Sequence, residues 1–95
     1  MSETHPVALV TGAARRLGAV IARTLHAAGY DVALHFRQSR GELDALADAL
    51  EARRAHSTLV LQAELADSAQ LPGVVDAVVA RFGRLDALVN NASIF

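Results

Sequence analysis

The sequence predicts an α/β fold in which parallel strands alternate with helices. Short apolar runs, partly of β-branched residues, alternate with longer stretches whose apolar residues recur at helical spacing. The connections between them are short, and the apolar runs lack the alternation of a strand with one wet face. Strands of that kind are buried by helices on both sides, so we expect one doubly wound parallel sheet.

Four strands are expected, at Val7–Val10, Val32–Phe36, Thr58–Leu61 and Leu85–Val89. With the helices between them, the order is β-α-β-α-β-α-β, the start of a Rossmann-type fold. The complete fold has about six strands, and a last apolar strand would leave an open edge. We therefore expect residues 1–95 to be the N-terminal dinucleotide-binding portion of one longer domain.

Three helices are expected between the strands. The first begins at Leu17 and is followed by Gly29, a residue suited to a left-handed C-cap. Its apolar face should comprise Leu17, Val20, Ile21, Leu25 and Ala28, with Arg23 and His26 opposite. The second, Glu42–Arg54, has the apolar stripe Leu43, Leu46, Ala47 and Leu50. The third carries Leu71, Val74, Val75, Val78 and Phe82, with Asp67 or Ser68 as N-cap and Gly83 after its end.

The composition excludes several classes of function. A chain that is 53% hydrophobic favours a packed core over a disordered tail, and a net charge of −1 gives no basic surface for nucleic acid or membranes. No apolar stretch approaches the roughly 18 residues of a membrane span, and the polar N-terminus is unlike a secretory signal. The absence of cysteine fits the cytoplasm. The four histidines lack metal-ligand spacing, so no metal site is expected.

A glycine-rich turn joins the first strand to the first helix, in the run Thr-Gly-Ala-Ala-Arg-Arg-Leu-Gly from Thr11 to Gly18. Gly12 can make the tight turn, Gly18 allows close packing of helix and strand, and the first helical amides then face an anion. All nine basic residues are arginine, so the lysine of a phosphate-loop NTPase is missing. Two arginines at a helix N-terminus oppose its dipole unless a phosphate is bound; we assign Arg16 to that phosphate and Arg15 to solvent.

The end of the second strand indicates which dinucleotide would bind. An NAD site has a carboxylate there for the ribose hydroxyl, whereas this chain has Arg37 and Ser39, which can hold a 2′-phosphate. We therefore expect NADPH. Asp31 stands at the other end of that strand and is interpreted as a turn residue.

These motifs resemble those of the short-chain dehydrogenase/reductase family, and Arg16-Leu17-Gly18 is similar to its pteridine reductase branch. The resemblance implies that Arg16 lies between the cofactor pyrophosphate and the pterin, and that Phe95 stacks on the pterin. The cofactor residues that it implies are Gly12, Arg16, Leu17, Gly18, His35, Phe36, Arg37, Ser39, Glu64, Leu65, Asn91, Ala92 and Ser93. The substrate residues that it implies are Arg16, Ser93 and Phe95.

Some of these residues have plainer alternatives. His35 could be a strand-end histidine satisfied by the backbone, Glu64 could be solvated, and Asn90 is interpreted as structural. The chain also departs from the branch at Gln38, where many members have arginine, and at Glu64, where the family usually has aspartate.

The leading hypothesis is an NADPH-dependent reductase of pterins, including dihydropterins and dihydrofolate. The alternatives are another short-chain reductase, such as one acting on 3-oxoacyl thioesters, and a non-catalytic NADPH-binding fragment. The family's catalytic tyrosine and lysine are implied downstream, because Tyr30 lies far from the site and there is no lysine. No residue here is assigned as catalytic, and a homotetramer is implied by the resemblance.

Overall fold

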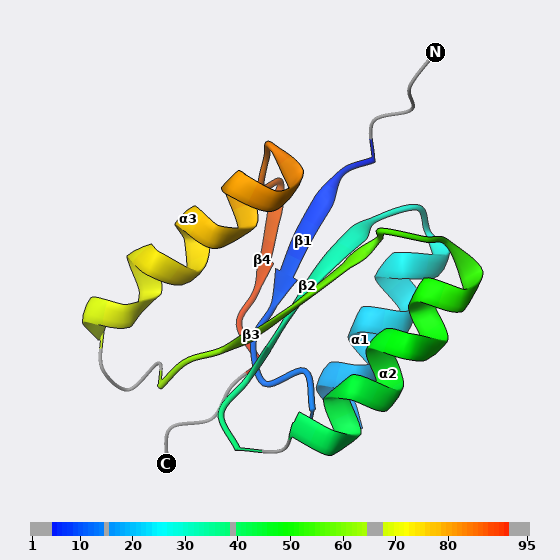
Figure 1. The fold of residues 1–95 in the computed structure, drawn as a ribbon, viewed down its shortest axis with the longest axis horizontal. Coiled ribbons are helices and arrows are strands. Elements are labelled where there is room, and N and C mark those ends of the chain that lie inside the picture. Colours follow the sequence, from blue (N-terminus) through cyan, green and yellow to red (C-terminus); the bar gives the residue numbers. More distant parts are fainter. Residues whose placement is uncertain (1–4, 15, 39, 65–67, 92–95) are drawn as a thin grey trace.

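The computed structural model describes residues 5–14, 16–38, 40–64 and 68–91. Within them, four parallel strands form one sheet in the order β3-β2-β1-β4 (Figure 1). The strands are β1 (Val7–Val10), β2 (Asp31–Phe36), β3 (Thr58–Gln62) and β4 (Ala87–Val89). The α/β, Rossmann-type prediction is therefore confirmed, although the fourth strand starts two residues later than expected.

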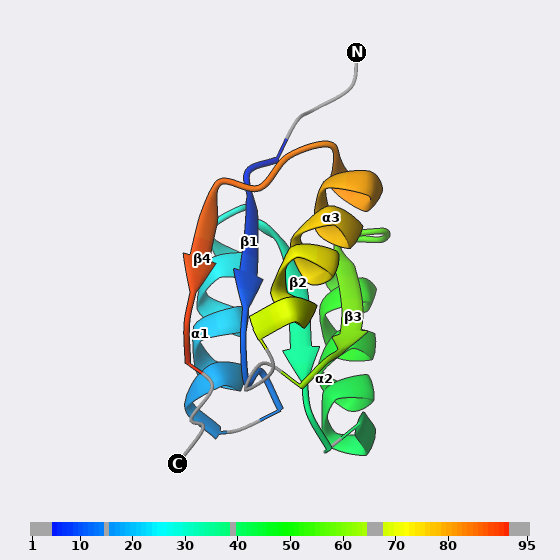
Figure 2. The ribbon, with the colours of Figure 1, turned by 90° about the vertical axis from the view of Figure 1, so that its left-hand side faces the viewer.

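Helices cover both faces of the sheet. α1 (Arg16–Ala27) and α2 (Arg40–Arg53) pack on one face, and α3 (Leu71–Phe82) packs on the other (Figure 1). The chain winds outward through β2 and β3, then returns past β1 to β4. The strand order therefore reverses between β1 and β4, where ligands bind in open α/β sheets. Figure 2 shows all four strands ending at the same edge, where α1 and α2 begin.

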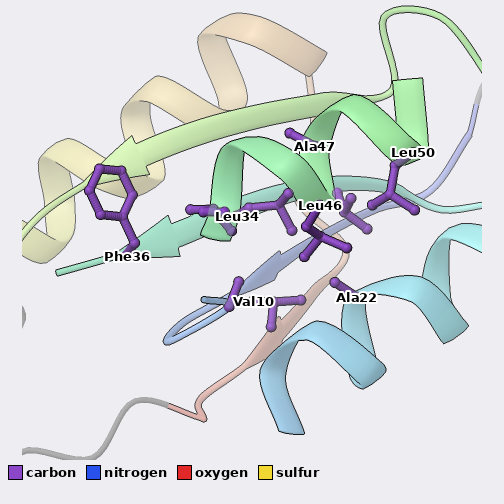
Figure 3. Close-up of a cluster of buried hydrophobic side chains, with 10 residues drawn as sticks. Val10, Ala22, Leu34, Phe36, Leu46, Ala47 and Leu50 are labelled. Atoms are coloured by element: carbon purple, nitrogen blue, oxygen red, sulfur yellow. The ribbon is translucent and has the colours of Figure 1, made fainter. Parts of the chain in front are cut away.

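The core has one layer on each face of the sheet. Between the sheet and the pair α1 and α2, the buried residues include Val10, Ala22, Leu34, Phe36, Leu46, Ala47 and Leu50 (Figure 3). On the α3 side, Val74 and Val78 pack with Val7, Leu9 and Ala33. The apolar stripe expected for the second helix is confirmed, because Leu43, Leu46, Ala47 and Leu50 are all buried.

The predicted inner face of α1 was only partly right. The buried residues of this helix are Gly18, Ala22 and His26, whereas Leu17 and Val20 are 62% and 55% exposed. Ile21 and Leu25 do pack against the core, so the error is a rotation of the helix. Its cause is the stripe of small residues at Gly18 and Ala22, which lets the helix approach the sheet more closely than a leucine would allow.

The predicted helix termini were partly right. Gly83 adopts φ 83° after α3, and its N–H donates to the Val79 carbonyl at 2.7 Å, as a left-handed cap should. Ser68 is not the N-cap: it belongs to a 3₁₀ turn, and Gln70 precedes the helix without a side-chain cap. Pro72 in the first turn needs no amide partner there. The other candidate cap, Asp67, lies outside the described residues.

A buried polar network closes the amino edge of the sheet. His26 Nε2 donates to Ser57 Oγ at 2.7 Å, and that hydroxyl donates to the Arg54 carbonyl at 2.5 Å. Arg54 Nη2 binds the Tyr30 carbonyl at 2.5 Å and Asp31 Oδ1 at 3.1 Å. Asp31 is thus the first residue of β2 and an ion-pair partner, where the sequence suggested a turn residue.

This network predicts acid-sensitive stability. Burial, and then the charge of Arg54, lowers the pKa of His26 below its ordinary value of about 6.5. The imidazole of His26 therefore takes up a proton more readily in the unfolded chain than in the folded one. The stability that neutral His26 contributes is present above about pH 6.5 and is lost as the pH falls further. Between about pH 7.5 and about pH 5, we expect the urea midpoint of the wild type to fall more steeply than the midpoint of His26→Gln.

The control is His56→Asn. His56 is an exposed histidine at φ 62°, a conformation that asparagine tolerates. This variant should keep the acid sensitivity of the wild type. Equal pH slopes for wild type and His26→Gln would show that His26 does not control it.

Candidate nucleotide-binding site

The turn after β1 is held by side chains from two neighbouring strands. Gly12 has φ 64°, which confirms the tight turn expected there. Its N–H donates to His35 Nδ1 at 3.0 Å, and its carbonyl accepts from Asn91 Nδ2 at 3.3 Å. The Thr11 hydroxyl adds bonds to Asn90 Oδ1 at 3.2 Å and from the Asn91 N–H at 2.9 Å. The strand ends of β1, β2 and β4 are thereby fixed together.

Gly18 faces this turn from the first helical residues. A Cβ at Gly18 would lie 2.8 Å from Asn91 Nδ2, 2.9 Å from Ala13 Cα and closer still to the Gly12 carbonyl oxygen. No real Cβ makes such contacts with backbone, so only glycine fits. The prediction that Gly18 allows close packing of helix and strand is confirmed.

His35 is buried, and both of its ring nitrogens are engaged. Nδ1 accepts from Gly12, so Nε2 carries the proton and donates to the Ala63 carbonyl at 2.8 Å. The side chain is 2% exposed and ties the glycine turn to the end of β3. This is the plainer alternative for His35, and its contact with a cofactor stays a prediction.

The turn leads into a helix terminus suited to an anion. The first amides of a helix have no intrahelical acceptor, and the positive end of the helix dipole lies there. The first turn of α1 contains no acidic residue, and Arg16 is its exposed first residue. Leu17 is exposed beside it. Arg15 lies outside the described residues.

The ends of β2 and β3 form a second charged group. Arg37 Nε lies 2.6 Å from Glu64 Oε2, with the two side chains 56% and 36% exposed. Phe36, which was predicted on the cofactor, is only 5% exposed and belongs to the core. Arg37 and Glu64, both predicted at this edge, form an ion pair there.

Arg40 was not predicted as a site residue. It begins α2, its guanidinium lies 5.8 Å from the centroid of the Phe36 ring, and it is 3.4 Å from Asp44. The signal that could have found it is the one used for Arg16, an arginine at the positive end of a helix. The remaining predicted residues, Ser39, Leu65, Ala92, Ser93 and Phe95, lie outside the described residues.

The described residues contain neither a membrane-spanning helix nor a metal-binding cluster. None of the described helices is long and apolar enough to cross a membrane. In the same part of the chain, no group of three or more histidine, aspartate or glutamate side chains could hold a metal ion.

The sheet is parallel with strand order 3-2-1-4, a glycine turn lies at its switch point, and arginines stand at two helix starts. These features are typical of nucleotide-binding α/β proteins. The sequence profile of the family described as short chain dehydrogenase matches residues 6–95. The chain belongs to this family.

Three relatives show how the chain compares within the family. It is 44% identical to pteridine reductase 1 of Leishmania tarentolae over 99% of its length, but covers 38% of that protein. It is 38% identical to an uncharacterized oxidoreductase of Methylorubrum extorquens over 94% of its length, covering 36% of that protein. It is 40% identical to the 3-oxoacyl-[acyl-carrier-protein] reductase FabG of Staphylococcus aureus over 92%, covering 35%. The chain thus spans little more than a third of these relatives.

We predict that Gly18→Ala destabilises the protein by about 1–3 kcal/mol, the usual cost of overpacking a tight contact. Gly73→Ala is the matched control, because a Cβ at this helical glycine has no atom within 4 Å. Alanine is the better helix former, so this variant should be as stable as the wild type or more so. Chemical denaturation of both variants measures the difference. Equal stability of the two would contradict the close contact at Gly18.

Proposed function

We propose that residues 1–95 are the N-terminal, cofactor-binding portion of an NADPH-dependent short-chain reductase that reduces pterins. The observation that carries the proposal is the placement of cations at two successive strand-to-helix turns. Arg16 starts α1 beside the glycine turn, and Arg37 and Arg40 flank the turn between β2 and α2. A pyrophosphate and a 2′-phosphate on one dinucleotide would meet these two groups separately.

The residues fit a phosphorylated dinucleotide. The amides at the start of α1, with Arg16, would hold the pyrophosphate, and Arg37 with Arg40 would hold the 2′-phosphate. The described end of β2 has no carboxylate of its own for a ribose hydroxyl. When bound, NADPH supplies a hydride. The chain's own residues would orient the cofactor, because Gly12, Gly18 and Asn91 fix the direction of the backbone amides at the start of α1.

Support for a pterin substrate comes from Arg16-Leu17-Gly18 and from the match to a pteridine reductase. On this proposal Arg16 also contacts the pterin, with Ser93 and Phe95. The catalytic tyrosine and lysine would lie in the rest of a full-length enzyme, which we propose to be a cytoplasmic homotetramer. Reduction of 3-oxoacyl thioesters is the second candidate, supported by the match to FabG.

The deciding experiment is a substrate comparison with the full-length protein. We expect NADPH oxidation that depends on biopterin or dihydrobiopterin, with little activity on acetoacetyl thioesters. The opposite preference would assign the chain to the second candidate. If the full-length protein binds NADPH but turns over neither substrate, the result would favour the third alternative, a protein that binds NADPH without catalysis.

Arg16 allows a finer prediction. If it contacts pterin as well as cofactor, Arg16→Gly should lower kcat/KM for the pterin by about 10–100-fold, the range of one lost charge-assisted hydrogen bond. The Kd for NADPH should rise much less, because the helical amides remain. Arg23→Ala removes another exposed arginine from the same helix and should change neither quantity. Equal losses in kcat/KM for the pterin and in affinity for NADPH would make Arg16 a phosphate ligand only.

A further inference from the structure

The ion pair between Arg37 and Glu64 joins two neighbouring strand ends at the carboxyl edge. Arg37 follows β2 and Glu64 follows β3 by two residues, and their Nε and Oε2 atoms are 2.6 Å apart. Both residues are also held through their backbones. The Arg37 carbonyl accepts from Gln62 Nε2 at 3.2 Å, and the Glu64 N–H donates to Gln70 Oε1 at 2.8 Å. The pair is therefore positioned by the ends of β2 and β3 and by the turn before α3.

This pairing engages the Nε–H of Arg37, one of the five N–H donors with which the guanidinium could hold a 2′-phosphate. A guanidinium binds a carboxylate and a phosphate through the same N–H groups. With Glu64 on Arg37, the pair carries no net charge, and the carboxylate repels a phosphate dianion that approaches it. Both side chains are partly exposed, so a ligand can reach the pair without unfolding the edge.

We propose that Glu64 is a specificity-determining residue, which sets the preference for a 2′-phosphorylated cofactor by competing with the phosphate for Arg37. This inference rests on the proposed function, since it requires a dinucleotide at this edge. Arg40 is the cation that does not share Glu64, because its carboxylate neighbour is Asp44 at 3.4 Å. A 2′-phosphate would thus be held by one arginine in competition with Glu64 and by a second at the start of α2.

The competition has a defined size. Exposed ion pairs are weak because water and salt screen them, but a phosphate dianion next to a carboxylate adds repulsion. Removing the charge of Glu64 should therefore tighten binding of a 2′-phosphate by about three- to tenfold. A ligand without that phosphate should be affected less than about twofold.

The test uses the full-length protein and two probes that differ only in the 2′-phosphate, adenosine 2′,5′-bisphosphate and adenosine 5′-monophosphate. Calorimetry measures the Kd of each for wild type, Glu64→Gln, Arg37→Gln and the double variant. We expect Glu64→Gln to tighten binding of the bisphosphate alone. When Arg37 is already replaced, this gain should shrink to the smaller part that comes from direct repulsion between Glu64 and the phosphate. Asp76→Asn is the matched control, since it removes one negative charge from the exposed face of α3 and should change neither Kd.

Other outcomes overturn the inference in distinguishable ways. If Glu64→Gln bound both probes more weakly by the same factor, Glu64 would contact the adenosine rather than compete with the phosphate. A gain of equal size in Asp76→Asn would reduce the effect to net charge. If the wild type prefers the bisphosphate but Glu64→Gln keeps the same preference, only the role of Glu64 fails. If the wild type binds neither probe, the proposed cofactor fails with it.

Discussion

The approach of α1 to the Gly12 carbonyl is the contact on which the geometry of the site depends. It exists because Gly18 has no side chain, and Asn91 stabilises it by donating to the same carbonyl. His35 holds the N–H of Gly12 on the other side. Both polar groups of one glycine are thus bound by side chains from two other strand ends. The direction of the helical amides is consequently set by the sheet rather than by a flexible loop.

The two edges of the sheet use arginine for different purposes. At the amino edge, Arg54 is mostly buried and binds the Tyr30 carbonyl and Asp31, so it joins the end of α2 to the start of β2. Its loss would leave buried acceptors unpaired, which costs more than a hydrogen bond contributes. At the carboxyl edge, Arg16, Arg37 and Arg40 are exposed. Cations there add little to folding, and an anionic ligand can reach them, at Arg37 in competition with Glu64.

The sequence predicted the order of elements because strands buried on both faces and amphipathic helices have distinct periods. It also predicted the need for glycine at Gly12 and Gly18, since the chemistry of a tight turn is local. It was only partly right for the inner face of α1, because a hydrophobic pattern ranks Leu17 and Val20 above the small residues that allow close packing. The partners of His35 and Arg37 could not be predicted, because each pairing depends on strand register across 23 residues or more.

The residues that shape the glycine turn and those that we propose to select the ligand are therefore separate. Gly12, Gly18 and His35 are buried, and the backbone amides that they orient would bind any pyrophosphate alike. Arg37 and Glu64 are partly exposed, lie at the ends of neighbouring strands and contribute little to the core. A change at this pair alters the charge that a ribose would meet without disturbing the turn. On this proposal, cofactor preference can vary while the glycine turn stays fixed.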